Sequence, residues 1–435
     1  MIRTNIGSAI PESNTYRIHS LFLGRGGGVS SKESRKRFRN NCPSSECYSG
    51  PWSRFENDEV ELVKLDRESV LVDHNSDAIG KQNAPFHEDV SFGDPGKTSI
   101  FHGMSTEDWN GNSWIVNNSS GAKRVPPPNP LCSLPRRNSF TWKGHTKGVH
   151  AVDLFPNSGH MLLSGSMDSS LKIWNVFNGR ECMMTYLGHS LGVRDAKFAF
   201  GGSKFYSCSF DTNVHLWDTE TGKVVLTFSN NSLNYSIAVQ PRDNNSIILA
   251  NHNKKVLQFD ALSGKLVLEY NEHLGPVSAV SFCEDGNKFI TSSDDRKIFV
   301  WNFGIPVVDK YASGTPGHAV PAIRVHPSGK FFVGQSMNNS IVSYQAFGEY
   351  RRQSNKTFFG HSNSGYAIQP GFSSDGKFIM SGSSDGKLYF WDWKTAKIYR
   401  NFQAHDGVCM GSLWHPAFPS QILTWGWDGA IKLWE

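Results

Sequence analysis

Residues 142–155 read "WKGHTKGVHAVDLF", and this stretch returns along the chain with its histidine and its alternating apolar residues. The second copy, "YLGHSLGVRDAKFAF", occupies 186–200, about 44 residues later. Further copies are "NEHLGPVSAVSF" (271–282), "PGHAVPAIRVH" (316–326), "FGHSNSGYAIQPGF" (359–372) and "QAHDGVCMGSLWH" (403–415). The leading histidines are His145, His189, His273, His318, His361 and His405. A period of this length is typical of repeat architectures.

The gap between His189 and His273 is about twice the period, and the weaker copy "SNNSLNYSIAVQ" (229–240) fills it. The chain therefore contains seven units. Five units share a second landmark, an aspartate six residues before a tryptophan: Asp168–Trp174, Asp211–Trp217, Asp295–Trp301, Asp385–Trp391 and Asp428–Trp434. The third unit has Asn253 and Phe259 at these places, and the fifth has Asn338 and Tyr344.

Turn residues divide each unit into short strands. In the first unit the turns are "PNSG" (156–159), "MDSS" (167–170) and "VFNG" (176–179), and the segments between them have strand length. Four strands in each of seven units predict an all-β, seven-bladed β-propeller. By the His/Asp/Trp pattern and the "LWD" at 216–218, residues 138–435 resemble a WD-repeat propeller.

The C-terminal stretch "AIKLWE" (430–435) reads as a strand with no following partner. WD-repeat units carry the outermost strand of one blade at the start of the next unit. The stretch "RNSFTWKGH" (137–145) precedes the first unit and is expected to pair with 430–435, so that the ring closes and only short edges remain.

The repeated polar residues predict a hydrogen-bond network inside each blade. We expect the turn aspartate to accept from the histidine, and a strand serine or threonine to link that histidine to the tryptophan N–H. A catalytic or metal-binding role is the alternative, but function rarely needs so many copies of one constellation. The units with Asn253 and Asn338 should be less rigid. The expected network residues are His145, Asp168, Trp174, His189, Asp211, Trp217, His273, Asp295, Trp301, His361, Asp385, Trp391, His405, Asp428 and Trp434.

Residues 1–137 differ in kind, because serine, asparagine, glycine and arginine dominate and hydrophobic periodicity is weak. This composition predicts an extended, mostly disordered basic arm with short docking motifs. Its basic island, 31–41, is either a nuclear-import signal, a contact to RNA backbone, or a solvated tail. The basic residues are Lys32, Arg35, Lys36, Arg37 and Arg39.

Two aromatic islands in the arm are candidate partner contacts. Trp52 and Phe55 stand in a polar setting and are plausible docking anchors. Trp109 and Trp114 belong to 97–115, which we expect to form a small hairpin on a partner or on the propeller's own side. The stretch "VPPPNP" (125–130) is a stiff spacer leading into the ring.

Composition and motifs favour a non-enzymatic protein without cofactor, metal or small-molecule substrate. The formal net charge of +5 over 435 residues is mild, and no apolar run has the length of a membrane span or of a secretory signal. The seven cysteines form no C-x-x-C, so an intracellular compartment is the simplest interpretation. The phosphate-binding and zinc-protease motifs are missing from the sequence.

Beyond the repeats, the chain resembles the pre-mRNA-processing factor seventeen family, cell-division-cycle-linked splicing proteins. The stretches that carry the resemblance include "HLGPVSAV" (273–280), "SSDDRKIFVW" (292–301), "GYAIQPGFSSDGKFIMSG" (365–382), "GKLYFWDWKTAKIY" (386–399) and "GWDGAIKLW" (426–434). In the arm, "GPW" (50–52) and the run from "IFH" to "DWNGNSW" match in the same order. The resemblance is close to full length, although the arm is shorter and the third unit is eroded.

The resemblance implies a nuclear, non-catalytic scaffold of the spliceosome that acts around the second transesterification, the ligation of exons. Its partners would be spliceosomal core proteins and second-step factors, with pre-mRNA and small nuclear RNAs in the same complex. No membrane is expected.

Two other readings of a WD propeller remain as alternatives. One is a substrate receptor or adaptor of another nuclear complex such as a ubiquitin ligase. Such receptors usually carry W-D-x-R, whereas the WD dipeptides at 217–218 and 391–392 continue as "WDTE" (217–220) and "WDWK" (391–394). The other is a propeller enzyme, which needs converging carboxylates or a cofactor at the central channel.

Overall fold

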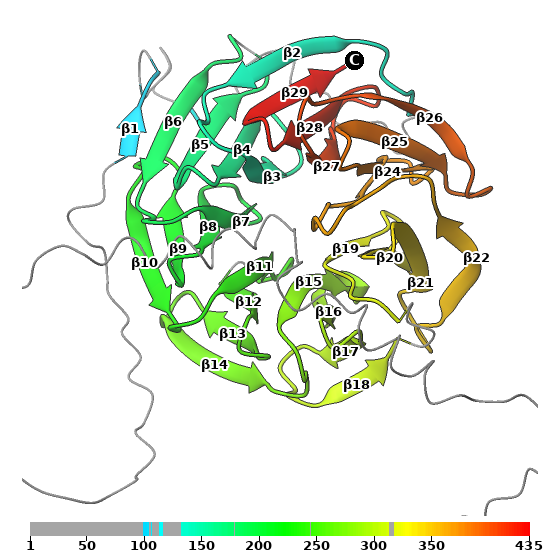
Figure 1. Cartoon of the computed structure of the whole chain (residues 1–435). Coiled ribbons are helices and arrows are strands. Elements are labelled where there is room, and N and C mark those ends of the chain that lie inside the picture. The colour runs from blue at the N-terminus through cyan, green and yellow to red at the C-terminus, as the bar shows by residue number, and fades with distance from the viewer. Residues whose placement is uncertain are drawn as a thin grey trace, which may run out of the picture. The chain divides into compact units, whose positions relative to one another are not determined.

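The computed structural model describes residues 99–103, 106, 113–115, 132–177, 179–243, 245–312 and 317–435. These residues form seven antiparallel sheets arranged as the blades of a ring (Figure 1). The predicted seven-bladed propeller is therefore confirmed. The helical content of the described residues is one 3-10 turn, η2 (Glu284–Gly286).

The blades follow one another along the chain, each built outward from its innermost strand. Blade one contains β3 (Val149–Leu154), β4 (Met161–Ser166), β5 (Ser170–Asn175) and β6 (Cys182–Leu187). Blade two contains β7 (Val193–Phe198), β8 (Lys204–Ser209), β9 (Asn213–Asp218) and β10 (Val224–Ser229). Blade three contains β11 (Asn234–Val239), β12 (Ser246–Asn251), β13 (Val256–Asp260) and β14 (Lys265–Tyr270).

Blades four to six repeat this order. Blade four contains β15 (Val277–Cys283), β16 (Lys288–Ser293), β17 (Ile298–Asn302) and β18 (Val308–Tyr311). Blade five contains β19 (Ala322–Val325), β20 (Phe331–Ser336), β21 (Ser340–Gln345) and β22 (Arg352–Phe358). Blade six contains β23 (Gly371–Phe372), β24 (Phe378–Gly382), β25 (Lys387–Asp392) and β26 (Ile398–Gln403).

Blade seven closes the ring with strands from both ends of the repeat region. Its inner strands are β27 (Cys409–Trp414), β28 (Ile422–Gly426) and β29 (Ala430–Trp434), and its outer strand is β2 (Asn138–Lys143). β2 pairs with β29 in antiparallel register, with Thr141 opposite Lys432. In Figure 1, β2 lies along the outside of β29. The predicted closure is confirmed, and it gives the last strand a partner on each side.

The turn between the second and third strand of each blade has a common backbone geometry. The residue after the landmark Asp or Asn has a positive φ, and a glycine stands there only in blades six and seven, at Gly386 and Gly429. The other five blades place a side chain in this left-handed conformation: Ser169, Thr212, Lys254, Arg296 and Asn339. The landmark side chain, which accepts hydrogen bonds from nearby backbone N–H groups, stabilises this strained geometry.

The hydrophobic core lies between neighbouring blades. One cluster joins Leu163 and Ile173 of blade one to Phe205 and Trp217 of blade two. The largest fully buried side chains are aromatic residues, most of them on the second and third strands of their blades, and burying one such side chain contributes about 2–3 kcal/mol. Packing between sheets rather than within one sheet therefore holds the ring together.

Blade one has a fifth strand, which lies in the segment 97–115 that was expected to form a small hairpin on a partner or on the propeller's own side. β1 (Ser99–Phe101) pairs antiparallel with β6, with Ile100 opposite Thr185. The sequence assigned this segment to the arm and placed the boundary at 137/138, but three of its residues extend a blade. Residues 132–137 also contact the ring, since Cys132 packs in the core between blades six and seven and the N–H of Arg136 bonds to the carbonyl of Glu435.

Candidate functional site

A hydrogen-bonded chain of four side chains crosses the first blade. The Nδ1–H of His145 donates to Asp168 Oδ2 at 3.0 Å. Nε2 of the same ring lies 2.8 Å from Ser164 Oγ, which also accepts the indole N–H of Trp174 at 2.8 Å. Both ring nitrogens and the indole N–H therefore have partners inside the blade.

Three other blades contain the same chain. The sets are His189–Asp211–Ser207–Trp217, His273–Asp295–Thr291–Trp301 and His405–Asp428–Thr424–Trp434, with distances of 2.8–3.0 Å. The histidines come from the loop before the innermost strand, the hydroxyls from the second strand and the tryptophans from the third. In these four blades the structure brings together the residues that the sequence selected.

The turn aspartates are held in their charged form. Burial raises the pKa of Asp168, but the hydrogen bond from His145 and the bonds from Ser170 outweigh it, so the pKa is lowered overall. The carboxylate also accepts the N–H groups of Thr146 and Ser170 at 3.0 Å each. Asp168 thus links the loop that precedes β3, through Thr146, to the turn between β4 and β5, through Ser170.

Blade six departs from this pattern, which corrects the sequence prediction for His361, Asp385 and Trp391. Nε2 of His361 lies 2.6 Å from the side-chain amide of Gln335, which belongs to blade five. Nδ1 of His361 is buried without a hydrogen-bond partner among the described residues.

The other two members of the blade-six set also have different partners. The indole of Trp391 donates to the carbonyl of Phe359 at 2.9 Å. The carboxylate of Asp385 lies 3.3 Å from Nζ of Lys387 at the surface. Ser381, at the position of the linking hydroxyl, instead donates to Gln335 Oε1 at 3.4 Å. The difference arises because the side chain of Gln335 extends across the interface from blade five and forms a hydrogen bond with His361.

Blades three and five lack the histidine chain. In blade three the Ser232 hydroxyl donates to Asn251 at 2.5 Å, and Asn251 also accepts the backbone N–H of Asn253. In blade five the leading His318 is exposed, and the hydroxyl of the buried Tyr344 has no hydrogen-bond partner among the described residues. These two blades are therefore stabilised by apolar packing and by hydrogen bonds between nearby residues, without the histidine chain.

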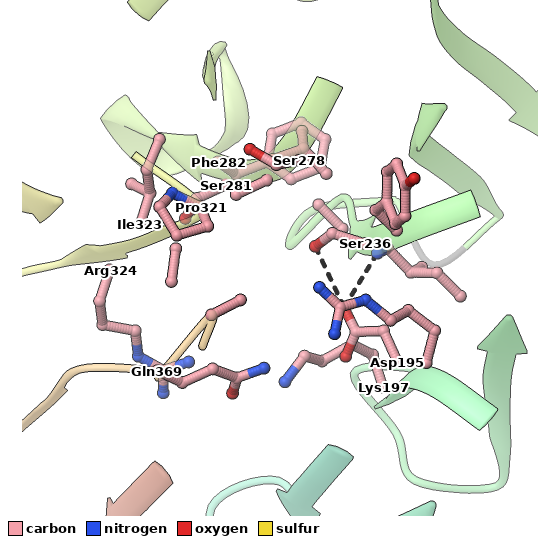
Figure 2. A pocket seen from close by; sticks show the side chains of 18 of the residues that line it. Asp195, Lys197, Ser236, Ser278, Ser281, Phe282, Pro321, Ile323, Arg324 and Gln369 are labelled. Carbon is pink, nitrogen blue, oxygen red and sulfur yellow. Dashed lines mark hydrogen bonds between the residues drawn. The ribbon is translucent and has the colours of Figure 1, made fainter. Parts of the chain in front are cut away.

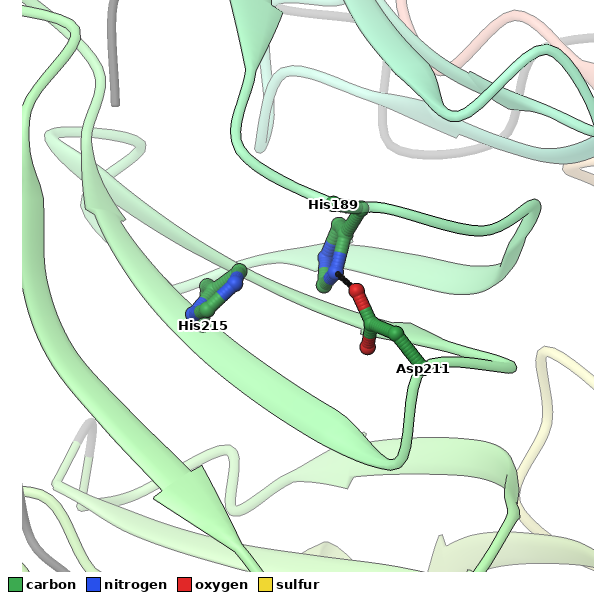
Figure 3. A group of neighbouring side chains, drawn as sticks. All are labelled: His189, Asp211 and His215. Carbon is green, nitrogen blue, oxygen red and sulfur yellow. Dashed lines mark hydrogen bonds and ion pairs between the residues drawn. The ribbon is translucent and has the colours of Figure 1, made fainter. Parts of the chain in front are cut away.

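One cluster has ligand types suited to a metal ion. His189, Asp211 and His215 place one ligand atom each within 4.8 Å of one another (Figure 3). Both nitrogens of His189 are already engaged, with Asp211 and Ser207, and Nδ1 of His215 lies 2.9 Å from Thr227 Oγ1. A metal ion at this place would have to displace the hydrogen bonds that His189 makes within the blade. We therefore interpret the cluster as the structural network of blade two, with the ring of His215 beside it.

The predicted partner-binding residues fall into two groups. Trp114 lies against the chain's own propeller, where it packs with Phe101 at a ring-centroid distance of 5.7 Å beside the core between blades one and two. This contact agrees with the second of the two placements expected for 97–115, and a role of the half-buried Trp114 in partner binding stays a prediction. The remaining candidates lie outside the described residues: Lys32, Arg35, Lys36, Arg37, Arg39, Trp52, Phe55 and Trp109.

A pocket of about 400 Å³ occupies the centre of the ring (Figure 2). Its lining comes mainly from the innermost strands β7, β11, β15 and β19, with His150 of β3 and residues 367–370 before β23. Sequence reasoning missed it, because the lining residues come from separate blades and meet only when the ring closes. The available signal was the variation inside the repeat, where Arg194, Lys197 and Arg324 occur on strands that otherwise carry small or apolar residues.

Positive charge predominates in this channel. The guanidinium of Arg194, only 6% exposed, donates to Nε2 of His150 and lies over the ring of Tyr235. Burial, and then the charge of Arg194, hold the pKa of His150 well below its ordinary value, so this ring is a neutral acceptor. The carboxylate of Asp195 is engaged by the Ser236 hydroxyl and the N–H of Ile237.

Among the described residues, the structure has no helix long and apolar enough to cross a membrane. The described cysteines are free thiols, and burial raises the pKa of Cys283 and Cys409 to about 12. These two thiols are therefore protonated at neutral pH and unreactive.

Comparison with known proteins places the chain among WD-repeat proteins of RNA processing. The family model "WD domain, G-beta repeat" matches residues 136–175, 180–218, 264–302 and 352–392. Pre-mRNA-processing factor 17 of Mus musculus is 39% identical over 414 residues, which cover 94% of this chain and 71% of that protein. The human protein of that name matches to the same extent. Pre-mRNA-processing factor 17 of Saccharomyces cerevisiae is 33% identical over 77% of this chain and 75% of its own length.

Identity at this level over both sequences exceeds what shared WD repeats require, because it continues into the arm before the ring. With the seven-bladed ring and its blade networks, it identifies the chain as a member of the pre-mRNA-processing factor 17 family.

Proposed function

We propose that this chain is a non-catalytic scaffold of the spliceosome that acts around the second transesterification of pre-mRNA splicing. The observation that carries the proposal is 39% identity over 94% of the chain to proteins named pre-mRNA-processing factor 17. A ring of seven blades offers several rigid faces to partners, and such a shape suits assembly rather than turnover. The site of action is the nucleus.

The His–Asp pairs support a structural role in this proposal. In four blades each pair is bonded to a hydroxyl that is bonded in turn to a tryptophan, so the hydroxyl has no open side for substrate. A nucleophile–base pair would need a reachable oxygen and a site for the developing oxyanion. We therefore assign these residues to the stability of the blades and not to catalysis.

We further propose that the N-terminal arm and the ring bind different components. The basic island with Lys36 and Arg37 is suited to RNA phosphates, and Trp52 and Phe55 to a groove on a core protein. In this proposal the partners are spliceosomal core proteins and second-step factors, in a complex that also holds pre-mRNA and small nuclear RNAs.

The test is to recover an epitope-tagged copy from a splicing-competent nuclear extract and identify the RNAs that accompany it. The proposal predicts small nuclear RNAs together with lariat intermediate and cleaved 5′ exon. Recovery of ubiquitin-ligase subunits without any of these RNAs would contradict it and favour the adaptor alternative. A variant with Lys32, Arg35, Lys36, Arg37 and Arg39 changed to glutamine separates the role of the basic island from that of the ring.

A further inference from the structure

We propose that the central channel is a binding site for a carboxylate-bearing, extended segment of a protein partner. The volume of about 400 Å³ falls within the ~300–1,000 Å³ of ordinary ligand sites. Binding in the channel depends only on the residues that line it and not on a role of the protein in splicing.

The charges that face the channel favour an anionic ligand. Three cations, Arg194, Lys197 and Arg324, line it, against the single carboxylate of Asp195. The carboxylate of Asp195 is already engaged by blade three, through Ser236 and the N–H of Ile237. A pocket with an excess of converging cations attracts and orients negative groups.

The three cations differ in exposure and in the partners they already have, so they would contribute differently to binding. Arg324 is exposed and has no ion-pair or hydrogen-bond partner among the described residues, so it is the primary anchor. Lys197 is held 3.7 Å from Asp153, and a carboxylate can share its ammonium. Arg194 is buried against His150 and Tyr235, where it adds fixed positive charge to the wall.

The side chains lie in a suitable arrangement. Figure 2 shows Lys197, Gln369 and Arg324 along one side of the pocket, opposite Ser278, Ser281 and Phe282. A bound carboxylate on that side would meet two cations and a side-chain amide donor. The opposite wall offers small hydroxyls and apolar surface, which suit the aliphatic part of a peptide.

Two features favour a peptide over RNA. The strands β7, β11, β15 and β19 stand at the ends of their sheets, and an extended peptide can bond to edge backbone groups other than the N–H groups of Phe198 and Ile237, which already donate to Asp153 and Asp195. Stacking of RNA bases needs open aromatic faces. The ring of Tyr235 carries the Arg194 guanidinium at 5.7 Å, and Phe282 packs on Phe289 and Phe303.

The test measures binding of fluorescein-labelled hexaglutamate to the purified full chain by fluorescence polarisation. Hexaglutamine serves as the uncharged control and hexauridylate as the RNA probe. The variants are Arg324→Gln, Arg324→Glu and Lys197→Gln, and the matched control is Lys265→Gln, an exposed lysine on the outer strand β14. Arg324 is exposed, so its replacement should leave the melting temperature unchanged.

We expect hexaglutamate to bind and hexaglutamine not to bind. Arg324→Gln and Lys197→Gln should each weaken hexaglutamate binding about fivefold, Arg324→Glu should abolish it, and Lys265→Gln should leave it unchanged. The inference is overturned if hexaglutamate does not bind, if the control variant loses as much as Arg324→Gln, or if Arg324→Gln binds like the parent chain. Tighter, Arg324-dependent binding of hexauridylate would overturn it in favour of RNA.

Discussion

His145 and Trp174 are joined through one hydroxyl: a ring nitrogen of the histidine and the indole nitrogen of the tryptophan each lie 2.8 Å from Ser164 Oγ. Asp168 fixes the tautomer, because it accepts the Nδ1–H of His145 and leaves Nε2 as an acceptor for the serine. The partly buried turn at 167–170 is thereby connected to the interior of the blade. The same relationship in three other blades shows that it is a general way of joining the strands of one blade to the loop before it.

The first prediction concerns the turn aspartate. Asp168→Ala should lower the free energy of unfolding by about 3 kcal/mol, because it removes the charged partner of a buried imidazole and the acceptor for two backbone N–H groups. Urea unfolding followed by tryptophan fluorescence measures the change. The matched control is Asp385→Ala in blade six, where the carboxylate is 42% exposed and pairs with Lys387, so a loss under about 1 kcal/mol is expected. Equal losses in the two variants would show that the network carries no special stability.

The second prediction concerns pH and His415. Its Nε2–H donates to the carbonyl of Gly159, and its Nδ1 accepts the N–H groups of Ala417 and Phe418, so the folded state holds a neutral ring. Burial lowers the pKa of His415 to about 4. The unfolded chain protonates near pH ~6.5, so it binds more protons between the two values and stability falls as the pH drops through this window.

The effect of His415 is measured as a slope. Between about pH 4.5 and 6, His415→Gln should reduce the dependence of unfolding free energy on pH by up to ~1.4 kcal/mol per pH unit. The variant will also be less stable at every pH, so the comparison uses slopes rather than absolute values. Parallel curves for the two proteins would show that this ring titrates alike in both states.

The third prediction concerns the added strand β1. Phe101 packs beside the core between blades one and two, whereas its neighbour Ile100 is 47% exposed. Phe101→Ala should cost about 1–2 kcal/mol and speed hydrogen exchange at 99–101, and Ile100→Ala should do little. Identical exchange in both variants would mean that this strand does not depend on its apolar contact.

The fourth prediction uses two glycines with the same backbone conformation. Gly222 and Gly304 have φ values of +68° and +82°. A Cβ on Gly222 would overlap Ser99 and Met184, whereas a Cβ on Gly304 meets nothing within 4 Å. Each alanine variant should lower the free energy of unfolding by about 1 kcal/mol, because alanine is strained in the left-handed backbone conformation. Only Gly222→Ala should also release β1. Protease cleavage near residue 99 reports release, and equal cleavage in both variants would contradict this contact.

The ring could be predicted from sequence because the signal repeats. Most units carry the same histidine, aspartate and tryptophan at the same spacing. This spacing shows where each unit begins, and it therefore predicts that 137–145 supplies the outer strand of the blade that contains 430–435. Four of the five predicted networks likewise depend only on residues of one unit. Local pattern is sufficient wherever all the partners belong to a single blade.

Prediction failed where the partner came from another blade. His361 keeps its place in the repeat, yet Gln335 of the neighbouring blade binds it, and spacing within a unit does not report that contact. The sequence left open whether 97–115 lies on a partner or on the propeller, because three residues far from the ring give no periodic signal that would assign β1 to blade one. The channel escaped notice because Arg194 and Arg324 come from blades two and five and meet only when the ring closes.

The most direct measurement of the central claim is complementation of second-step splicing. A nuclear extract is depleted of the endogenous pre-mRNA-processing factor 17, and splicing intermediates are followed on a labelled pre-mRNA after the purified chain is added. The account predicts that depletion accumulates lariat intermediate and free 5′ exon, and that this chain restores ligated exons. Accumulated intermediates that the folded chain fails to convert would contradict the proposed function.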